Sequence, residues 1–140
     1  MLSSNRPCLH LYRNCSSNPS AFGYTAFHPF PVFVLVLVML EYEFVIFEWD
    51  DQKNRSNRLK HGISFEAAHH VFFDEHCLTE FHRIENGDER WKTLGLLGGE
   101  VVVFIGHLVA EDAAGREVIR LITARKADPK EREEYYANYP

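Results

Sequence analysis

The chain has 140 residues, enough for one domain, and 46% of them are hydrophobic, including 11 Phe and 6 Tyr that can fill a core. Its formal net charge of −5 at pH 7 argues against a protein that binds nucleic acid through bulk positive charge. Residues 39–140 carry 13 Lys and Arg against 20 Asp and Glu, a charge of −7. Within this acidic part the basic residues cluster at 53–60 and 116–132, which permits a local basic groove on an otherwise acidic protein.

The first 38 residues differ in composition from the rest, because they contain no acidic residue and are rich in Ser, Asn and Pro. The apolar run over residues 32–40 is too short for a helix that spans a bilayer. It also lies too far along the chain for a secretory signal and no cleavage site follows it. The run is a candidate β-strand, but the composition changes at Met39. We therefore interpret 1–38 as a dispensable extension from a mis-assigned start, and 39–140 as the domain.

The next stretch predicts a strand, a short basic helix, a break and a second helix. The apolar residues at 44–47 predict a strand over residues 43–49. Asp50 is a good helix N-cap, and Gly62 can adopt the left-handed conformation that ends a helix. Ser64 can then cap a second helix over residues 65–73.

The remainder of the chain predicts four strands and a last helix. Asn86-Gly87 is a strong hairpin signal between the first two strands, and Gly98-Gly99 and the turn at 113–115 separate the others. The strands are expected over residues 76–82, 89–97, 100–108 and 116–124. Asp128, Pro129 and Glu131 predict a helix that begins with a capping box. The order β-α-α-β-β-β-β-α predicts a small α+β domain with an antiparallel meander sheet.

The first helix is strongly basic, with Lys53, Arg55, Arg58, Lys60 and His61 within nine residues. Leu59 is its only large apolar residue, so little of it can be buried. Such a run is usually a solvated surface helix. A helix that faces phosphates is the other interpretation, and the stretch alone does not decide between them.

Three short motifs have the residue types for cleaving RNA without a metal: Lys60-His61-Gly62, Glu89-Arg90-Trp91-Lys92, and the stretch 123–127. That reaction needs a group that takes the proton of the 2′-hydroxyl, a group that protonates the 5′-oxygen, and cations that stabilise the phosphorane. Arg90 and Arg125 suit the last task, because a guanidinium matches phosphate oxygens bidentately. His61 is a candidate acid or base, and Glu89 is a second candidate base.

Each of these residues also has a plain structural explanation. His61 at a helix C-terminus interacts favourably with the helix dipole. Glu89 and Arg90 are neighbours on a strand, so they point to opposite faces and at most one of them faces a given site. Trp91 is as well suited to covering the core as to stacking on a base, and Lys126 can be a solvated residue at the entry to the last helix.

A metal site and a cofactor are not expected. His69, His70, His76 and His82 do not have the spacing of a zinc site, and Cys77 is the only cysteine of the domain. The three cysteines show no disulfide pattern, which suggests a reducing compartment and a cytoplasmic protein.

Several motifs occur in a fixed order over residues 42–136. They are Phe47-Glu48-Trp49-Asp50, Lys53-Asn54, the stretch 60–68, Phe72-Phe73-Asp74, Glu89-Arg90-Trp91 with Gly95, and the stretch 122–127 followed by Glu131-Arg132 and Tyr135. This set resembles the BrnT family of toxins. The resemblance implies a RelE-like fold and a ribonuclease toxin of a type II toxin–antitoxin pair. It implies toxicity through basic residues at strand ends, here Arg90 and Arg125, and more loosely through Lys60 and His61.

Two hypotheses follow. In the first, the chain is a metal-independent endoribonuclease that cleaves RNA by attack of the 2′-hydroxyl, with Arg55, Arg58, Trp91 and Lys126 as further RNA-binding residues. The resemblance implies neutralisation by a BrnA-like antitoxin with a ribbon-helix-helix domain, through which alone the toxin would contact operator DNA. In the second hypothesis, the chain is a non-catalytic partner of such a repressor and acts in operon regulation.

Overall fold

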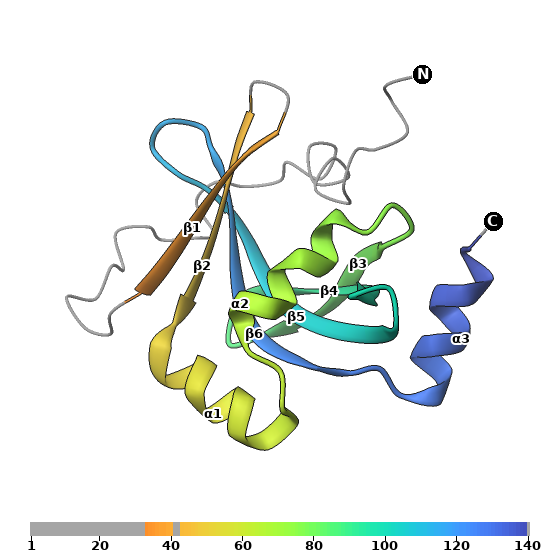
Figure 1. Cartoon of the computed structure of the whole chain (residues 1–140). Coiled ribbons are helices and arrows are strands. Elements are labelled where there is room, and N and C mark those ends of the chain that lie inside the picture. Colours follow the sequence, from red (N-terminus) through yellow and green to blue (C-terminus); the bar gives the residue numbers. More distant parts are fainter. Residues whose placement is uncertain (1–32, 41–42, 140) are drawn as a thin grey trace.

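The computed structural model describes residues 33–40 and 43–139, which form an α+β domain around one six-stranded sheet (Figure 1). The strand order is β1-β2-β6-β5-β4-β3. The elements are β1 Phe33–Leu40, β2 Glu43–Asp50, α1 Asp51–His61, α2 Phe65–Ala68, the 3₁₀ helix η4 His69–Phe73, β3 Leu78–Glu85, β4 Asp88–Leu97, β5 Val101–Glu111, β6 Glu117–Lys126 and α3 Pro129–Ala137.

The sheet is mixed, and the antiparallel meander predicted from the sequence is one part of it. Strands β3 to β6 form the predicted antiparallel meander. Strand β2 pairs with β6 in parallel, over Val45–Glu48 and Glu117–Arg120. The partners in this pairing lie far apart in the sequence, and the apolar pattern of a strand does not reveal the direction of its neighbour.

The local signals at the helix ends are confirmed. The Asp50 side chain accepts hydrogen bonds from two backbone N–H groups of α1, and Gly62 ends that helix with φ 75°. Ser64 caps α2 by accepting from the Ala67 N–H. The second predicted helix is α-helical for a single turn and continues as the 3₁₀ helix η4. Asp128 and Glu131 form the predicted capping box of α3.

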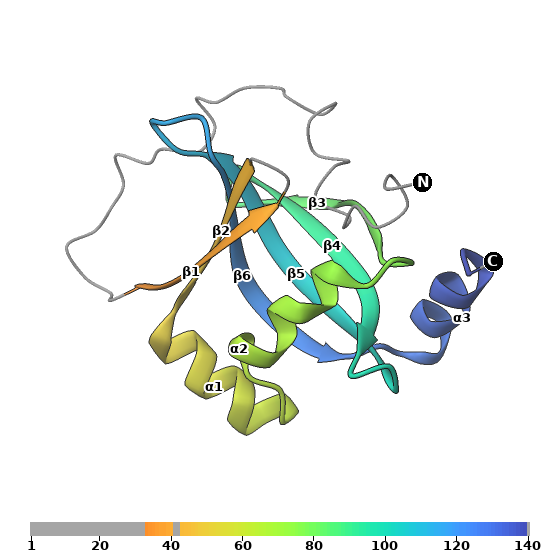
Figure 2. The same ribbon diagram turned by 45° about the horizontal axis from the view of Figure 1, so that its top comes forward.

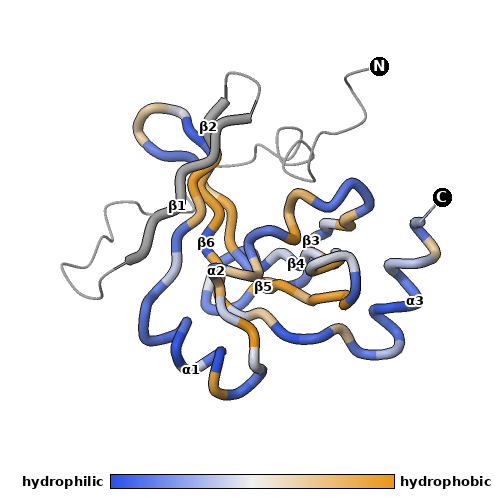
Figure 3. The backbone as a smooth tube through the Cα atoms, viewed as in Figure 1, coloured by the Kyte–Doolittle hydropathy of each residue, from blue (hydrophilic) through white to orange (hydrophobic). Residues whose placement is uncertain are grey.

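The two faces of the sheet carry separate apolar clusters, because alternate residues of each strand point to opposite sides. On the α2 face, Trp49, Phe65, Phe72 and Ile105 belong to the larger cluster, and Figures 1 and 2 show α2 and η4 lying across this face. On the other face, here the α3 face, a smaller cluster joins Tyr135 to residues of β4 and β5. Figure 3 shows apolar stretches along β5 and β6, and mostly polar residues along α1 and α3.

Strand β1 bears on the predicted extent of the domain. It pairs antiparallel with β2 along its full length, from Phe33 opposite Asp50 to Leu40 opposite Glu43. The predicted start at Met39 lies inside this strand. We expect a chain that begins at Met39 to lose this pairing and to melt at a lower temperature than the full chain. Thermal unfolding of the two chains measures this, and equal midpoints would support a dispensable segment 1–38.

Cys77 is buried at the start of the meander, and the structure gives it as disulfide-bonded. The sequence-based interpretation of the three cysteines as free of disulfides is therefore wrong for this residue.

His107 is fully buried, and its Nε2 lies 2.8 Å from the Thr93 hydroxyl. Desolvation lowers its pKa to about 3, although a backbone hydrogen bond at Leu108 opposes the shift. An unfolded chain with a histidine pKa of about 6.5 binds more protons, so stability falls as the pH drops from about 6.5 towards 3. At pH 5 we expect this group to cost about 2 kcal/mol of unfolding free energy.

The check is urea unfolding at pH 7 and pH 5 for the wild type and for His107→Gln. Carboxylates also titrate in this range, but they contribute equally to both proteins. The variant should lose less stability on acidification than the wild type. Parallel losses in the two proteins would show that His107 is not the acid-sensitive group.

Candidate functional site

The C-terminal end of α1 is fixed to the end of β6 by Asn57, a buried residue of the basic helix. Its Nδ2 donates to the carbonyl oxygens of Ile63 at 2.9 Å and Ala124 at 2.8 Å. Its Oδ1 accepts from the Ala124 N–H at 3.1 Å and from the Thr123 hydroxyl at 3.2 Å. The helix is therefore solvated along most of its length but held firmly where it ends beside Arg125.

His61 lies at this junction. Its pKa is lowered by partial burial and by the positive charges of Lys60 and Arg125. The structure thus brings together three predicted site residues that come from two separate motifs. Because its pKa is below the usual value near 6.5, His61 is neutral at pH 7 and its imidazole can accept a proton.

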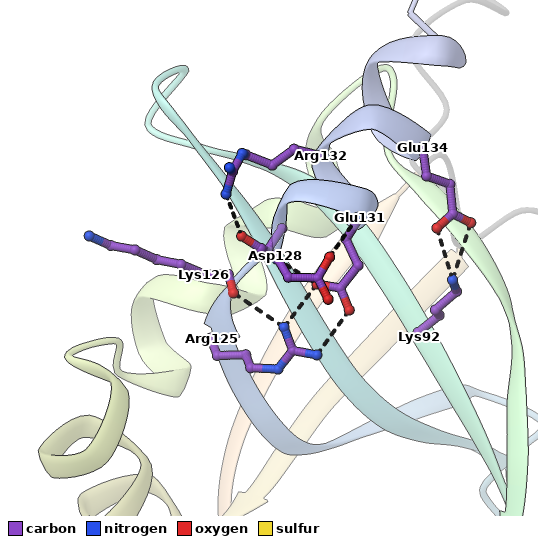
Figure 4. Close-up of polar contacts among 8 residues, drawn as sticks. Lys92, Arg125, Lys126, Asp128, Glu131, Arg132 and Glu134 are labelled. Carbon is purple, nitrogen blue, oxygen red and sulfur yellow. Dashed lines mark hydrogen bonds and ion pairs between the residues drawn. The ribbon is translucent and has the colours of Figure 1, made fainter.

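Arg125 lies at the end of β6 and is held by α3 (Figure 4). Its Nη1 and Nη2 donate to the two carboxylate oxygens of Glu131 at 2.8 and 2.9 Å. The guanidinium also lies 4.1 Å from the centre of the Phe104 ring. The hydrogen bonds to Glu131 raise the pKa of Arg125. In Figure 4 the exposed side chain of Lys126 points away from this cluster.

Lys92 is a second cation on the α3 face, and the sequence predicted it only as part of the motif at 89–92, with no role of its own. Its ammonium group lies 2.6 Å from Glu80 and 3.1 Å from Glu134, and its side chain is 15% exposed. Desolvation lowers its pKa, but the two carboxylates outweigh this and the net shift is upward. The signal in the sequence is its spacing of two from Arg90, which places both residues on one face of β4.

Arg90 lies on the same face as Arg125, but the structure does not bring the two together. Leu94, Phe104 and Arg125 form one row across the sheet, and Arg90 is four residues from Leu94 on β4. From ordinary strand spacings, the Cα atoms of the two arginines are roughly 15 Å apart. Arg90 is mostly buried, with its Nε 3.4 Å from Glu85. Its Nε and Nη1 make no hydrogen bond within the described residues.

The remaining predicted site residues lie elsewhere. Glu89 is exposed and belongs to the α2 face, as does Trp91, which packs against the larger core cluster and the Phe81 ring. Arg55 is exposed and pairs with Asp51 one turn earlier in α1, and Arg58 is also exposed. The structure therefore separates Glu89 and Trp91 from the Arg125 junction.

In the part of the chain that the structure describes, no three His, Cys, Asp or Glu side chains are grouped so that they could hold a metal ion. His69 is buried among aromatic rings and its pKa is lowered by desolvation and by His70. Within the same described ranges, no helix is long and apolar enough to cross a membrane.

The fold and the site define a small α+β domain in which a histidine at the end of α1 and an arginine at the end of β6 lie at one junction. A family model described as "Ribonuclease toxin, BrnT, of type II toxin-antitoxin system" matches residues 49–131, more than half of the chain. The chain belongs to this family, and the resemblance found in its motifs is confirmed. Membership implies an antitoxin partner.

Among solved structures, the chain is similar to the Brucella abortus ribonuclease toxin BrnT. The two share 20% identity, with a TM-score of 0.42, over 57% of this chain and 92% of that chain. No curated protein matches the chain.

Proposed function

We propose that the chain is a metal-independent endoribonuclease of RelE-like fold that cleaves RNA by attack of the 2′-hydroxyl. Membership of a family of ribonuclease toxins supports the activity. The observation that carries the site is the anchoring of the end of α1 to the end of β6 by Asn57, which places His61 and Arg125 at one junction. The toxin domain in this proposal is 39–140, which includes the matched residues 49–131, and the residues of β1 before Met39 add stability but no site residue.

In this reaction the 2′-oxygen attacks phosphorus and the 5′-oxygen leaves, which gives a 2′,3′-cyclic phosphate. Neutral His61 takes the 2′-hydroxyl proton, the leaving 5′-oxygen takes a proton from water, and Arg125 with Lys60 stabilises the charge of the phosphorane. We assign the base to His61 and not to Glu89, because Glu89 lies on the α2 face. Arg90 binds a phosphate further along the RNA, and Arg55, Arg58 and Lys126 add exposed charge along its path.

The proposed partner is a BrnA-like antitoxin with a ribbon-helix-helix domain. The pair contacts operator DNA only through the antitoxin, and the toxin acts on RNA in the cytoplasm. The family description supports an antitoxin in general terms. Co-purification of the chain with the product of a neighbouring reading frame tests the pairing.

The test of the chemistry is cleavage of RNA by the purified chain in EDTA. We expect products that end in a 2′,3′-cyclic phosphate, and no cleavage of the same oligonucleotide with 2′-O-methyl groups. Activity that is lost in EDTA and restored by one particular metal would overturn the mechanism, as would cleavage of the 2′-O-methyl substrate.

A second function is a non-catalytic interaction partner of the repressor. It is favoured by the ion pairs of Arg125 and Lys92 with carboxylates of the same chain, since such pairs can serve only to hold α3. In that case Arg125→Ala would bind the antitoxin as the wild type does, and neither protein would cleave RNA.

A further inference from the structure

Helix α3 places two carboxylates on the two cations of the α3 face (Figure 4). Glu131 binds Arg125 of β6, and Glu134 binds Lys92 of β4. Positions three apart on a helix are neighbours on one side of it, so both carboxylates point to the sheet together. Two cations from different strands are thus bound by a single nine-residue helix.

The Arg125–Glu131 contact has the geometry in which a guanidinium binds a phosphate. Both terminal nitrogens of Arg125 donate, one to each carboxylate oxygen, at 2.8 and 2.9 Å. This two-bond arrangement serves carboxylates and phosphates alike. The Phe104 ring beneath the guanidinium holds its plane in place. The arginine is therefore fixed for an oxyanion ligand and already holds one from its own chain.

Few other contacts hold α3 in place. The Tyr135 ring is buried in the smaller cluster, and its hydroxyl donates to Asp74 at 2.6 Å. Arg132 donates to the Ala127 carbonyl within the segment that leads into the helix. Glu133 and Tyr136 on the same helix are exposed. One buried ring with its hydrogen bond to Asp74 and two ion pairs connect this helix to the rest of the described domain, and just beyond the helix the Tyr139 ring packs on His76.

We propose that Arg125 and Lys92 form a binding site for two phosphates of an RNA chain, and that α3 covers this site with Glu131 and Glu134 until the helix moves away. This rests on the proposed function for the identity of the ligand. With α3 in place, the two cations face three carboxylates, those of Glu80, Glu131 and Glu134. Removal of α3 changes the local charge from −1 to +1, so an acidic protein gains a cationic surface for RNA.

The experiment compares the full chain with the double variant Glu131→Gln/Glu134→Gln. Glutamine keeps the shape of each side chain and still serves a capping box, so the start of α3 is preserved. Glu133→Gln/Glu100→Gln is the matched control, because it removes two exposed carboxylates that make no ion pair within residues 33–40 and 43–139. The probe is a fluorescent 2′-O-methyl oligoribonucleotide, which the proposed nuclease cannot cleave, and binding is followed by anisotropy at several salt concentrations.

We expect the double variant to bind the probe roughly tenfold more tightly than the control and the wild type. The slope of log K against log salt should grow by about 1.4, for two added phosphate contacts on a single strand. Adding Lys92→Ala to the double variant should remove about half of this increase. Tyr135→Phe, which loosens α3 without changing any charge, should also tighten binding.

If the double variant and the control bind the probe with equal affinity and equal salt dependence, the proposal that α3 covers an RNA-binding site is wrong, even if the wild type cleaves RNA. In that case the ion pairs only stabilise α3, and the double variant should melt at a lower temperature. Loss of cleavage in Glu131→Gln with unchanged probe affinity would also overturn it, since Glu131 would then act in the reaction. If the wild type cleaves no RNA but the double variant binds the probe as expected, the cover stands and the proposed nuclease function fails.

Discussion

Replacing Arg125 with alanine is expected to lower the rate of RNA cleavage roughly 10²–10³-fold, by analogy with the loss of one donor to an oxyanion. The guanidinium follows directly after Ala124, to which Asn57 holds the end of α1, and its charge acts on the imidazole of His61. The folded chain should lose little stability, because a partly exposed ion pair contributes about 0–1 kcal/mol. Expression of this variant without antitoxin should be tolerated by cells. Cleavage rates and melting midpoints of the same preparations measure both effects.

Three variants make the comparison specific. Arg125→Lys keeps the charge and loses the planar fork, so it should recover only part of the rate. Arg116→Ala removes one charge in the turn before β6, where Arg116 pairs with Asp112, and should cleave like the wild type. Arg90→Ala should weaken RNA binding more than it slows the chemical step, since Arg90 lies roughly 15 Å from Arg125 by strand spacing. If Arg125→Ala cleaves RNA at the wild-type rate, Arg125 serves only to hold α3 against the sheet and takes no part in the reaction.

The parts of the fold that depend on neighbouring residues were predictable from the sequence. Asp50, Gly62, Ser64 and the capping box at Asp128 act through the backbone of residues within one turn, so residue type and spacing suffice to identify them. The hairpin at Asn86 is of the same kind, with φ 54° at Asn86 and 82° at Gly87. Each was found where the sequence placed it.

The parts that depend on residues far apart in the chain were not predictable. Strand β2 pairs with β6 in parallel and with β1 at the edge of the sheet. Several strands have similar apolar patterns, so the sequence does not show which of them are neighbours. The pairings of β2 turn the predicted antiparallel meander into a mixed sheet. The order of the motifs along the chain does not determine whether a strand pairs parallel or antiparallel to its neighbour.

The site shows the same limit at the level of single residues. The sequence predicts that Glu131 caps α3, and its carboxylate does accept from the Asp128 N–H. The same carboxylate also binds Arg125, which the sequence does not predict. Lys92 belongs to the same motif as Arg90 and Trp91, but its ion pairs with Glu80 and Glu134 are not evident from the sequence. Asn57 is an ordinary polar residue in a basic helix until the structure brings it against β6. The roles of these residues depend on partners far away in the chain, and a single sequence does not show which distant residues are in contact.

Asn57→Ala is expected to lower the unfolding free energy by about 3–4 kcal/mol, since it leaves several buried polar groups without a partner. The Ala124 N–H and the carbonyl oxygens of Ile63 and Ala124 all lose a hydrogen bond. The end of α1 should then separate from β6, and His61 should move with it. We therefore expect RNA cleavage to fall at temperatures where the variant is still folded, as urea unfolding and cleavage assays on one preparation will measure.

Asn54→Ala is the matched comparison, because Asn54 is a buried asparagine one turn earlier in the same helix. It accepts from the Phe65 N–H and donates to Glu66, so it holds α2 and makes no hydrogen bond to β6. This variant should lose stability by a similar mechanism and keep most of its cleavage rate below its melting midpoint. If both variants lose cleavage only in proportion to unfolded chain, the position of α1 on β6 does not matter for the reaction. If Asn57→Ala alone is slow while folded, the contact between α1 and β6 is what holds His61 beside Arg125.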